Sequence, residues 1–113
     1  MALGASLACA QPAGDAAKGA GVFDDHCSEC HVLEGVGQGP SLAGVVGRKA
    51  GNLPTYPYTS AIKASGLAWT AANLDRFLMG PKKLVPGTAM SVTVVDPTER
   101  RDLIAYLATL KAR

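Results

Sequence analysis

Two cysteines and a histidine stand together in the run Cys27-Ser28-Glu29-Cys30-His31, which has the pattern C-x-x-C-H. This pattern is the attachment signature of c-type haem. The chemistry explains the spacing, because two thiols add to the vinyl groups along one porphyrin edge while the adjacent imidazole is placed under the iron. The motif therefore predicts one haem c, bound covalently through Cys27 and Cys30, with His31 as an axial ligand.

Other sites built from the same residue types fit less well. A thioredoxin-like redox pair needs a strand before its C-x-x-C, whereas residues 15–26 have the pattern of a helix. A zinc site made from His26 and the motif would lack the distant second ligand pair that structural zinc sites use. A thiol protein without haem, a redox pair and a zinc site are thus the disfavoured alternatives.

A second axial ligand must approach the iron from the face opposite His31. His26 is next to Cys27 and tied to the same edge, so it cannot cross over. Met79 follows Leu74 by five residues, which places it about 140° from the inward face of its helix at 3.6 residues per turn. Met79 is therefore expected at the surface.

The remaining candidates are Met90 and the lysines after Pro81. Met90 follows Pro86 and Gly87 in a stretch between two predicted helices, where such residues can turn a side chain inward. Most methionines are flexible core fillers, but a haem that needs a distal ligand makes Met90 the predicted second iron ligand. Ligation by His and Met raises the reduction potential.

Length, composition and charge exclude several classes of protein. A chain of 113 residues is one domain, because a second core could not bury enough surface. Hydrophobic residues make up 48%, charged residues 18%, and the formal net charge is +2, so neither disorder nor a nucleic-acid-binding surface is indicated. No apolar run reaches the roughly 18 residues of a membrane span. We expect a monomer that binds no nucleic acid and does not span a membrane.

The first ten residues carry no charge and end in small side chains, like the tail of an export signal. We predict that residues 1–10 are removed by cleavage after Ala10, which leaves 11–113 as the folded domain. The alternative is a lipid-modified Cys9, although Ser6 stands where a lipobox normally has Leu. Thioether attachment belongs outside the reducing cytoplasm, so the predicted location is the periplasm, with the mitochondrial intermembrane space as the alternative.

Four helices and one long loop are expected to position these residues. A helix over 15–26 with Gly19, Phe23 and Cys27 at steps of four delivers the cysteines. The stretch 34–58 is rich in Gly and Pro and has no regular period, which is typical of a loop that wraps something. A short helix is predicted over 59–65.

Two further helices follow. Thr70 caps a helix through Met79 that Gly80-Pro81 ends, and Asp96-Pro97-Thr98-Glu99 begins a helix at the carboxyl end. The predicted inward residues are Leu74, Phe77 and Leu78 on the first and Leu103, Tyr106, Leu107 and Leu110 on the second, with Lys111 and Arg113 suiting the dipole of its last turn. The expected fold is all-α, with three to five helices and long loops around one covalent haem.

The sequence resembles the class I cytochromes c, of the mitochondrial cytochrome c and bacterial cytochrome c2 group. The resemblance runs from about Asp15 to Leu110. Beyond the haem motif it rests on Gly39-Pro40-Ser41-Leu42-Ala43-Gly44, Gly47-Arg48-Lys49-Ala50-Gly51, Tyr58-Thr59, Gly66-Leu67-Ala68-Trp69, Pro81-Lys82-Lys83-Leu84-Val85-Pro86-Gly87-Thr88 and Asp102-Leu103-Ile104-Ala105-Tyr106-Leu107. The loop before Gly39 is shorter than in mitochondrial proteins, which indicates a bacterial relative.

The resemblance implies roles for residues around the haem. Pro40 would pack against His31 and orient its imidazole through the backbone carbonyl. The residues implied near the haem propionates are Arg48, Tyr58, Trp69 and Thr88. Gly19 and Phe23 would meet Leu103 and Tyr106 where the terminal helices cross.

Departures from the family pattern concern the pocket and the docking face. Phe77 stands where the family often has Tyr, and Ile62 where it often has Asn, so the pocket should be drier. Val92 replaces an aromatic residue, and His26 and Ala89 replace docking lysines. Lys82 and Lys83 remain as candidates for partner docking, and Lys18, Lys49 and Lys63 could add to the same positive face.

The function implied is that of a one-electron carrier that cycles Fe(III) and Fe(II), and not an enzyme. Its partners would be a bc1-type donor and an oxidase or photosynthetic reaction centre as acceptor, met in short encounters. The alternatives are a weak haem peroxidase or a redox sensor that works through a labile Met90.

Overall fold

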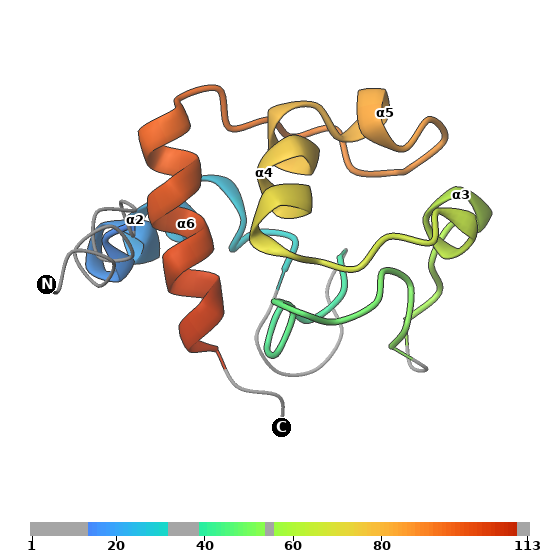
Figure 1. Cartoon of the computed structure of the whole chain (residues 1–113), viewed down its shortest axis with the longest axis horizontal. Helices are drawn as coiled ribbons and strands as arrows, with labels where there is room; N and C mark the ends of the chain where they lie inside the picture. Colours follow the sequence, from blue (N-terminus) through green and yellow to red (C-terminus); the bar gives the residue numbers. More distant parts are fainter. Residues whose placement is uncertain (1–13, 32–38, 54–55, 111–113) are drawn as a thin grey trace, which may run out of the picture.

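The computed structural model describes residues 14–31, 39–53 and 56–110. These residues form five helices and no strand apart from one isolated bridge between Lys49 and Ala68. The helices are α2 (Ala16–His26), α3 (Ser60–Ala64), α4 (Ala71–Met79), α5 (Pro81–Leu84) and α6 (Pro97–Thr109) (Figure 1). The predicted all-α class is confirmed. None of these helices is long and apolar enough to cross a membrane.

Helix α2 begins where an aspartate satisfies its exposed N–H groups. Oδ1 of Asp15 accepts from the backbone N–H of Ala17 at 3.0 Å and of Lys18 at 3.3 Å. Gly19 and Phe23 are buried, as the steps of four predict. The helix ends directly before the haem motif, so its inward face continues into the cysteines. The predicted export segment, residues 1–10, lies outside the described residues.

Helix α6 starts with the predicted cap. Oδ1 of Asp96 accepts from the N–H groups of Thr98 and Glu99, and Pro97 occupies the first turn, where no backbone N–H is needed. Of the predicted inward face, Leu103 and Leu107 are buried, while Tyr106 and Leu110 are partly buried and pack against the core. Lys111 and Arg113 lie outside the described residues.

Helices α2 and α6 cross and pack against each other (Figure 1). The rings of Phe23 and Tyr106 meet at the crossing with centroids 5.5 Å apart. At Gly19 the two backbones approach so closely that a Cβ atom would overlap the main-chain carbonyl of Asp102. The carboxylate of Asp102 in turn accepts the backbone N–H of Asp15 at 2.7 Å. Close approach at Gly19 thus fixes the two helices that support the haem motif.

The substitution Gly19→Ala is expected to destabilise the fold by about 1–3 kcal/mol, because the added methyl group forces α2 away from α6. Gly21→Ala is the matched control, since a Cβ on this exposed residue of the same helix meets nothing within 4 Å. It should stabilise by about 0.5–1 kcal/mol, the ordinary gain of Ala over Gly in a helix. Denaturant unfolding measures both, and shifts of the same sign would contradict the proposed packing.

The middle helices follow the predicted signals, with one addition. Thr70 caps α4 by accepting from the N–H of Asn73 at 3.1 Å, and Leu74, Phe77 and Leu78 are buried. Met79 is 52% exposed, as its helical angle predicts. Gly80-Pro81 ends α4 but also begins the short helix α5, which the sequence patterns did not predict. Proline favours the first position of a helix, so the same pair both ends one helix and starts the next.

The loop between the haem motif and α3 is irregular in its described parts, as predicted. It is held to the segment before α4 by main-chain hydrogen bonds, from Gly47 to the carbonyl of Trp69 and from Trp69 to that of Arg48, each 2.8 Å. Gly47 has φ of +90°, a conformation that favours glycine. These bonds bring Arg48 and Trp69 to one side of the molecule, facing the centre.

Candidate haem site

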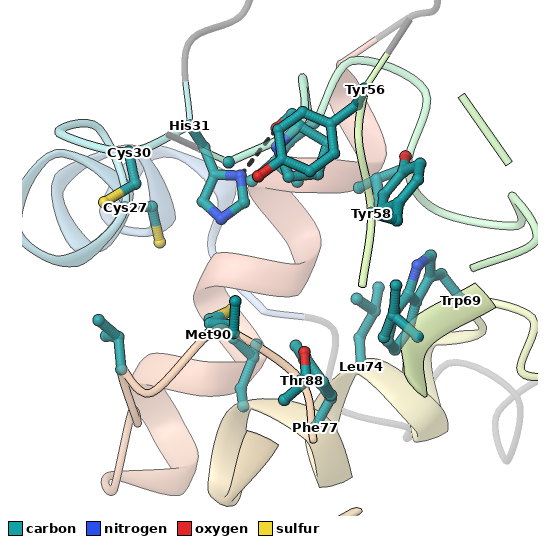
Figure 2. Close-up of a pocket in the computed structure, with 18 of the residues that line it drawn as sticks. Cys27, Cys30, His31, Tyr56, Tyr58, Trp69, Leu74, Phe77, Thr88 and Met90 are labelled. Carbon is teal, nitrogen blue, oxygen red and sulfur yellow. Dashed lines mark hydrogen bonds between the residues drawn. The ribbon is translucent and has the colours of Figure 1, made fainter. Parts of the chain in front are cut away.

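The cysteines lie on a turn that leaves α2. The backbone N–H groups of Cys30 and His31 both donate to the carbonyl of Cys27, at 3.2 and 2.8 Å. Cys27 is buried and Cys30 is half-buried, and no disulfide joins them. Cys27, Cys30 and His31 all line the same space, and they lie next to one another at its edge (Figure 2).

The ring of His31 is fixed by the loop that follows. Its Nδ1 lies 2.8 Å from the carbonyl oxygen of Pro40, to which it donates, and this leaves Nε2 with the free electron pair that a metal needs. Burial lowers the pKa of His31, partly offset by the bond to Pro40, so the neutral ligating form is favoured. A Cβ on Gly39 would stand 2.5 Å from the ring, so only glycine leaves the imidazole this room.

Met90 lies across the cavity from His31. Figure 2 shows its side chain on the far side, with the second ring nitrogen of His31 directed toward that side. Met90 is partly buried and packs against the core, in contrast to the exposed Met79. The buried Thr88 lines the same wall. The structure therefore brings the two predicted axial ligands to opposite walls of one space.

That space is a cavity of about 470 Å³ at the centre of the molecule. Every residue predicted to bind the haem lines it, namely Cys27, Cys30, His31, Pro40, Arg48, Tyr58, Trp69, Thr88 and Met90. Much of the remaining lining is apolar and comes from the loop, α3, α4 and α6, including Leu42, Val45, Ile62, Leu74, Phe77, Leu78, Leu103 and Leu107. The candidate docking residues Lys82 and Lys83 are exposed on α5 and do not line the cavity.

The polar residues that line the cavity on the side of the loop already make hydrogen bonds within the protein. The guanidinium of Arg48 donates to the carbonyls of Ala43 and Ser41, both at 3.0 Å. Burial lowers the pKa of Arg48, while the nearby Tyr58 raises it. The hydroxyl of Tyr58 accepts the N–H of Leu53 at 3.3 Å. An arginine has five N–H donors, so Arg48 keeps donors for a further acidic group.

Tyr56, which the sequence patterns did not single out, also lines the cavity. Its ring meets that of Tyr58 edge to face, with centroids 4.9 Å apart. The sequence offered one indication that Tyr56 lies beside Tyr58 at the cavity. The two tyrosines are two residues apart, and alternate residues point the same way when a segment is extended. Nothing in the irregular loop indicated that this segment was extended.

The residues present fit a haem. The cavity offers two thiols near one imidazole nitrogen, a thioether on the opposite wall and an otherwise largely apolar lining, which suits a large, flat, apolar macrocycle with a central iron. A redox-active thiol pair fits less well, because burial and the neighbouring Cys30 raise the pKa of Cys27 to about 11, whereas reactive thiols of such pairs have a lowered pKa. In the described part of the chain, no three His, Cys, Asp or Glu side chains gather as a metal-ion site would require.

Comparisons with known proteins identify the family. The cytochrome c family model matches residues 16–111. Cytochrome c2 of Rhodomicrobium vannielii is 46% identical over 114 residues, covering 95% of this chain and 90% of the relative. Cytochrome c of Guizotia abyssinica is 43% identical over 100 residues, covering 85% and 90%.

A solved structure supports the same assignment. Cytochrome cH from Methylobacterium extorquens superposes with a TM-score of 0.81 at 48% identity, covering 85% of this chain and 99% of that one. Family model, relatives and fold thus agree with the haem motif and with the cavity behind it. The chain belongs to the cytochrome c family, as a class I cytochrome c with one haem bound covalently through Cys27 and Cys30.

Proposed function

We propose that this chain is a one-electron carrier in which His31 and Met90 ligate the haem iron from opposite sides. Membership of the cytochrome c family makes it an electron carrier. The finer proposal is supported by one observation above all, that Nε2 of His31 and the thioether of Met90 face each other across one cavity. With both axial positions filled by side chains, a substrate has no open position at the metal.

The haem, when bound, supplies an iron that alternates between Fe(III) and Fe(II). Cys27 and Cys30 hold it at one edge, and Pro40 keeps the His31 ring in place through its carbonyl. Arg48, Tyr58, Trp69 and Thr88 are proposed to receive the propionates, because buried carboxylates need cationic or hydrogen-bonding partners. The apolar walls exclude water and so favour the less charged, reduced state.

The apolar lining of the cavity should affect the reduction potential of the haem. Ile62 and Phe77 are buried and both line the cavity, so Ile62→Asn and Phe77→Tyr add polar groups beside the haem. Each is expected to lower the reduction potential by on the order of tens of millivolts, where about 59 mV corresponds to 1.4 kcal/mol for one electron, and to alter the stability of the Met90 bond. Phe23→Tyr is the matched control, since Phe23 lies outside the cavity. Potentiometric titration measures the reduction potential of each variant. If Ile62→Asn and Phe77→Tyr both leave the potential and the Met90 bond unchanged, the apolar lining at these positions does not control them.

Partner docking is proposed to use the lysines of α5. Lys82 and Lys83 are both exposed, and Nζ of Lys82 donates to the carbonyl of Thr88 at 2.7 Å, beside the Met90 segment. Interfaces for fast electron transfer are small, and charges at their rim act mainly on the association rate.

Changing both lysines to Glu should slow electron exchange with a bc1-type donor or an oxidase severalfold at low salt. The effect should fade above about 0.1 M salt, where the Debye length falls to about 10 Å. Lys83→Glu alone separates docking from the contact of Lys82 with Thr88. Arg76→Glu reverses an exposed charge that does not line the cavity and serves as control. The rates are measured by stopped flow. If the double variant keeps the salt dependence of the unmodified protein, the two lysines are not part of the interface.

The proposed partners are a bc1-type complex as donor and a terminal oxidase or photosynthetic reaction centre as acceptor. The proposed location is the periplasm, which the relationship to a cytochrome c2 supports, with the mitochondrial intermembrane space as the alternative. The protein is proposed to act as a monomer and to meet its partners transiently. Both respiratory and photosynthetic chains use carriers of this kind.

A weak peroxidase or a redox sensor working through a labile Met90 is the second candidate. The test is a potentiometric titration of the purified protein combined with a peroxide assay. The carrier predicts a single reversible one-electron transition and negligible turnover of peroxide. Rapid peroxide turnover by the unmodified protein would favour the second candidate instead.

A further inference from the structure

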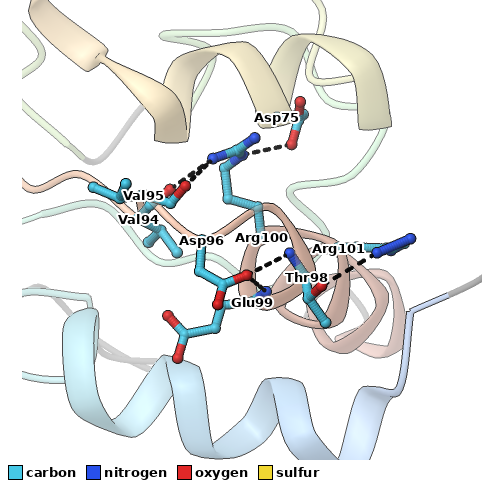
Figure 3. A network of polar contacts seen from close by, with 8 residues as sticks. All are labelled: Asp75, Val94, Val95, Asp96, Thr98, Glu99, Arg100 and Arg101. Atoms are coloured by element: carbon cyan, nitrogen blue, oxygen red, sulfur yellow. Dashed lines mark hydrogen bonds and ion pairs between the residues drawn. The ribbon is translucent and has the colours of Figure 1, made fainter.

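Arg100 is a buried cation near the start of α6. Its side chain is 8% exposed, and its Nε donates to Oδ1 of Asp75 at 2.7 Å (Figure 3). The N-terminal end of a helix disfavours positive charge, so this guanidinium requires acceptors from elsewhere in the fold. Asp75 lies on α4, and the ion pair therefore joins α6 to α4.

The same guanidinium holds the segment that leads into α6. Its Nη1 donates to the carbonyls of Val94 at 3.0 Å and Val95 at 2.8 Å. Val94 is 1% exposed, and its own N–H donates to the carbonyl of Leu78 on α4 at 2.8 Å. Residues 94–95 are thus fixed between the two helices.

Met90 lies a short way before this anchor. On its other side, the carbonyl of Thr88 accepts from Nζ of Lys82. Between these two anchors, within the described part of the chain, the backbone of residues 89–93 makes no hydrogen bond to another backbone group. The position of the Met90 side chain therefore depends on the anchors at Thr88 and at 94–95 and on its packing in the cavity.

We propose that the Asp75–Arg100 ion pair is a positioning device that keeps the Met90 thioether at the iron. This inference rests on the proposed function, because it takes Met90 as the second axial ligand. Removing the carboxylate leaves a buried guanidinium without its anion, which is costly. Arg100 then turns toward water, the carbonyls of residues 94–95 lose their donor, and the Met90 segment opens more readily.

Partial exposure of Asp75 limits how much the ion pair stabilises the fold. The Asp75 side chain is 42% exposed, so the pair is worth less than a fully buried one and the fold should survive its loss. The opened segment would leave the sixth position to any small nitrogen donor that reaches the cavity. Imidazole is such a donor and replaces the thioether without a change in oxidation state.

The experiment titrates imidazole into the ferric holoprotein and follows loss of the Met-to-iron charge-transfer band. Asp75→Ala is expected to raise the imidazole affinity at least about tenfold, which corresponds to about 1.4 kcal/mol. Asp75→Asn keeps an oxygen that can accept from Nε of Arg100 and removes the charge, so an intermediate rise is expected.

Asp15→Ala is the control for a general loss of stability. It removes the cap of α2, and its hydrogen bonds go to α2 and Asp102, not to the Met90 segment. Its imidazole affinity should match that of the unmodified protein. An equal rise in Asp15→Ala and Asp75→Ala, or no rise in Asp75→Ala, would overturn the positioning role. Absence of the charge-transfer band from the unmodified protein would overturn Met90 ligation itself, and so the proposed function.

Discussion

Replacing both Cys27 and Cys30 by Ser should yield a chain without covalent haem that does not hold its fold. The cavity between the helices measures about 470 Å³. Its lining is largely apolar, and without the haem these side chains would face water instead of the porphyrin, so their burial would no longer stabilise the fold. The net stability of a small domain is only about 5–15 kcal/mol, so losing the burial of this lining should unfold the chain.

Two measurements check this result. Haem staining after denaturing electrophoresis reports the covalent bonds, and far-ultraviolet circular dichroism reports the helices. Glu29→Gln is the control, because Glu29 stands between the two cysteines but is exposed and does not line the cavity, so the haem should remain bound. A double variant that retained native helix content without haem would show that the apolar walls close by themselves and that the fold does not depend on the haem.

Replacing Met90 by Leu should lower the reduction potential by a few tenths of a volt, within the range of about 0.8 V that axial ligands set. Leucine has nearly the volume of methionine, so the fold should remain while the sulfur donor is lost. The Met-to-iron charge-transfer band should disappear, and the sixth position should become open to added ligands and to peroxide.

Met79→Leu provides the comparison for Met90→Leu. Met79 is 52% exposed at the end of α4, so the same substitution there should leave both the potential and the band unchanged. Potentiometry and absorption spectroscopy of the two variants decide between the methionines. A Met90→Leu protein with its band and potential intact would exclude Met90 as the ligand.

Much of the fold was predictable because its signals are local. Thr70 and Asp96 each cap the helix that the sequence places after them, as predicted. The spacing of Leu74, Phe77 and Leu78 fixed the buried face of α4 and left Met79 outside. The haem motif is equally local, since its chemistry requires two thiols and an imidazole within one turn.

Contacts between distant residues were not predictable in the same way. Asp75 and Arg100 are 25 residues apart in the chain, and a charged residue on a helix is ordinarily solvated, so no pattern marks the pair. Arg100 gave a faint signal as a cation near the start of a helix, where the dipole opposes it. Tyr56 and the helix α5 were missed for a related reason, because loop geometry is set by what the loop packs against.

The most direct test of the central claim is the absorption spectrum of the purified ferric protein. If His31 and Met90 occupy the two axial positions of a haem held by Cys27 and Cys30, the spectrum is that of a covalently bound low-spin haem with the Met-to-iron charge-transfer band. A high-spin haem, or a low-spin haem without that band, would contradict the claim.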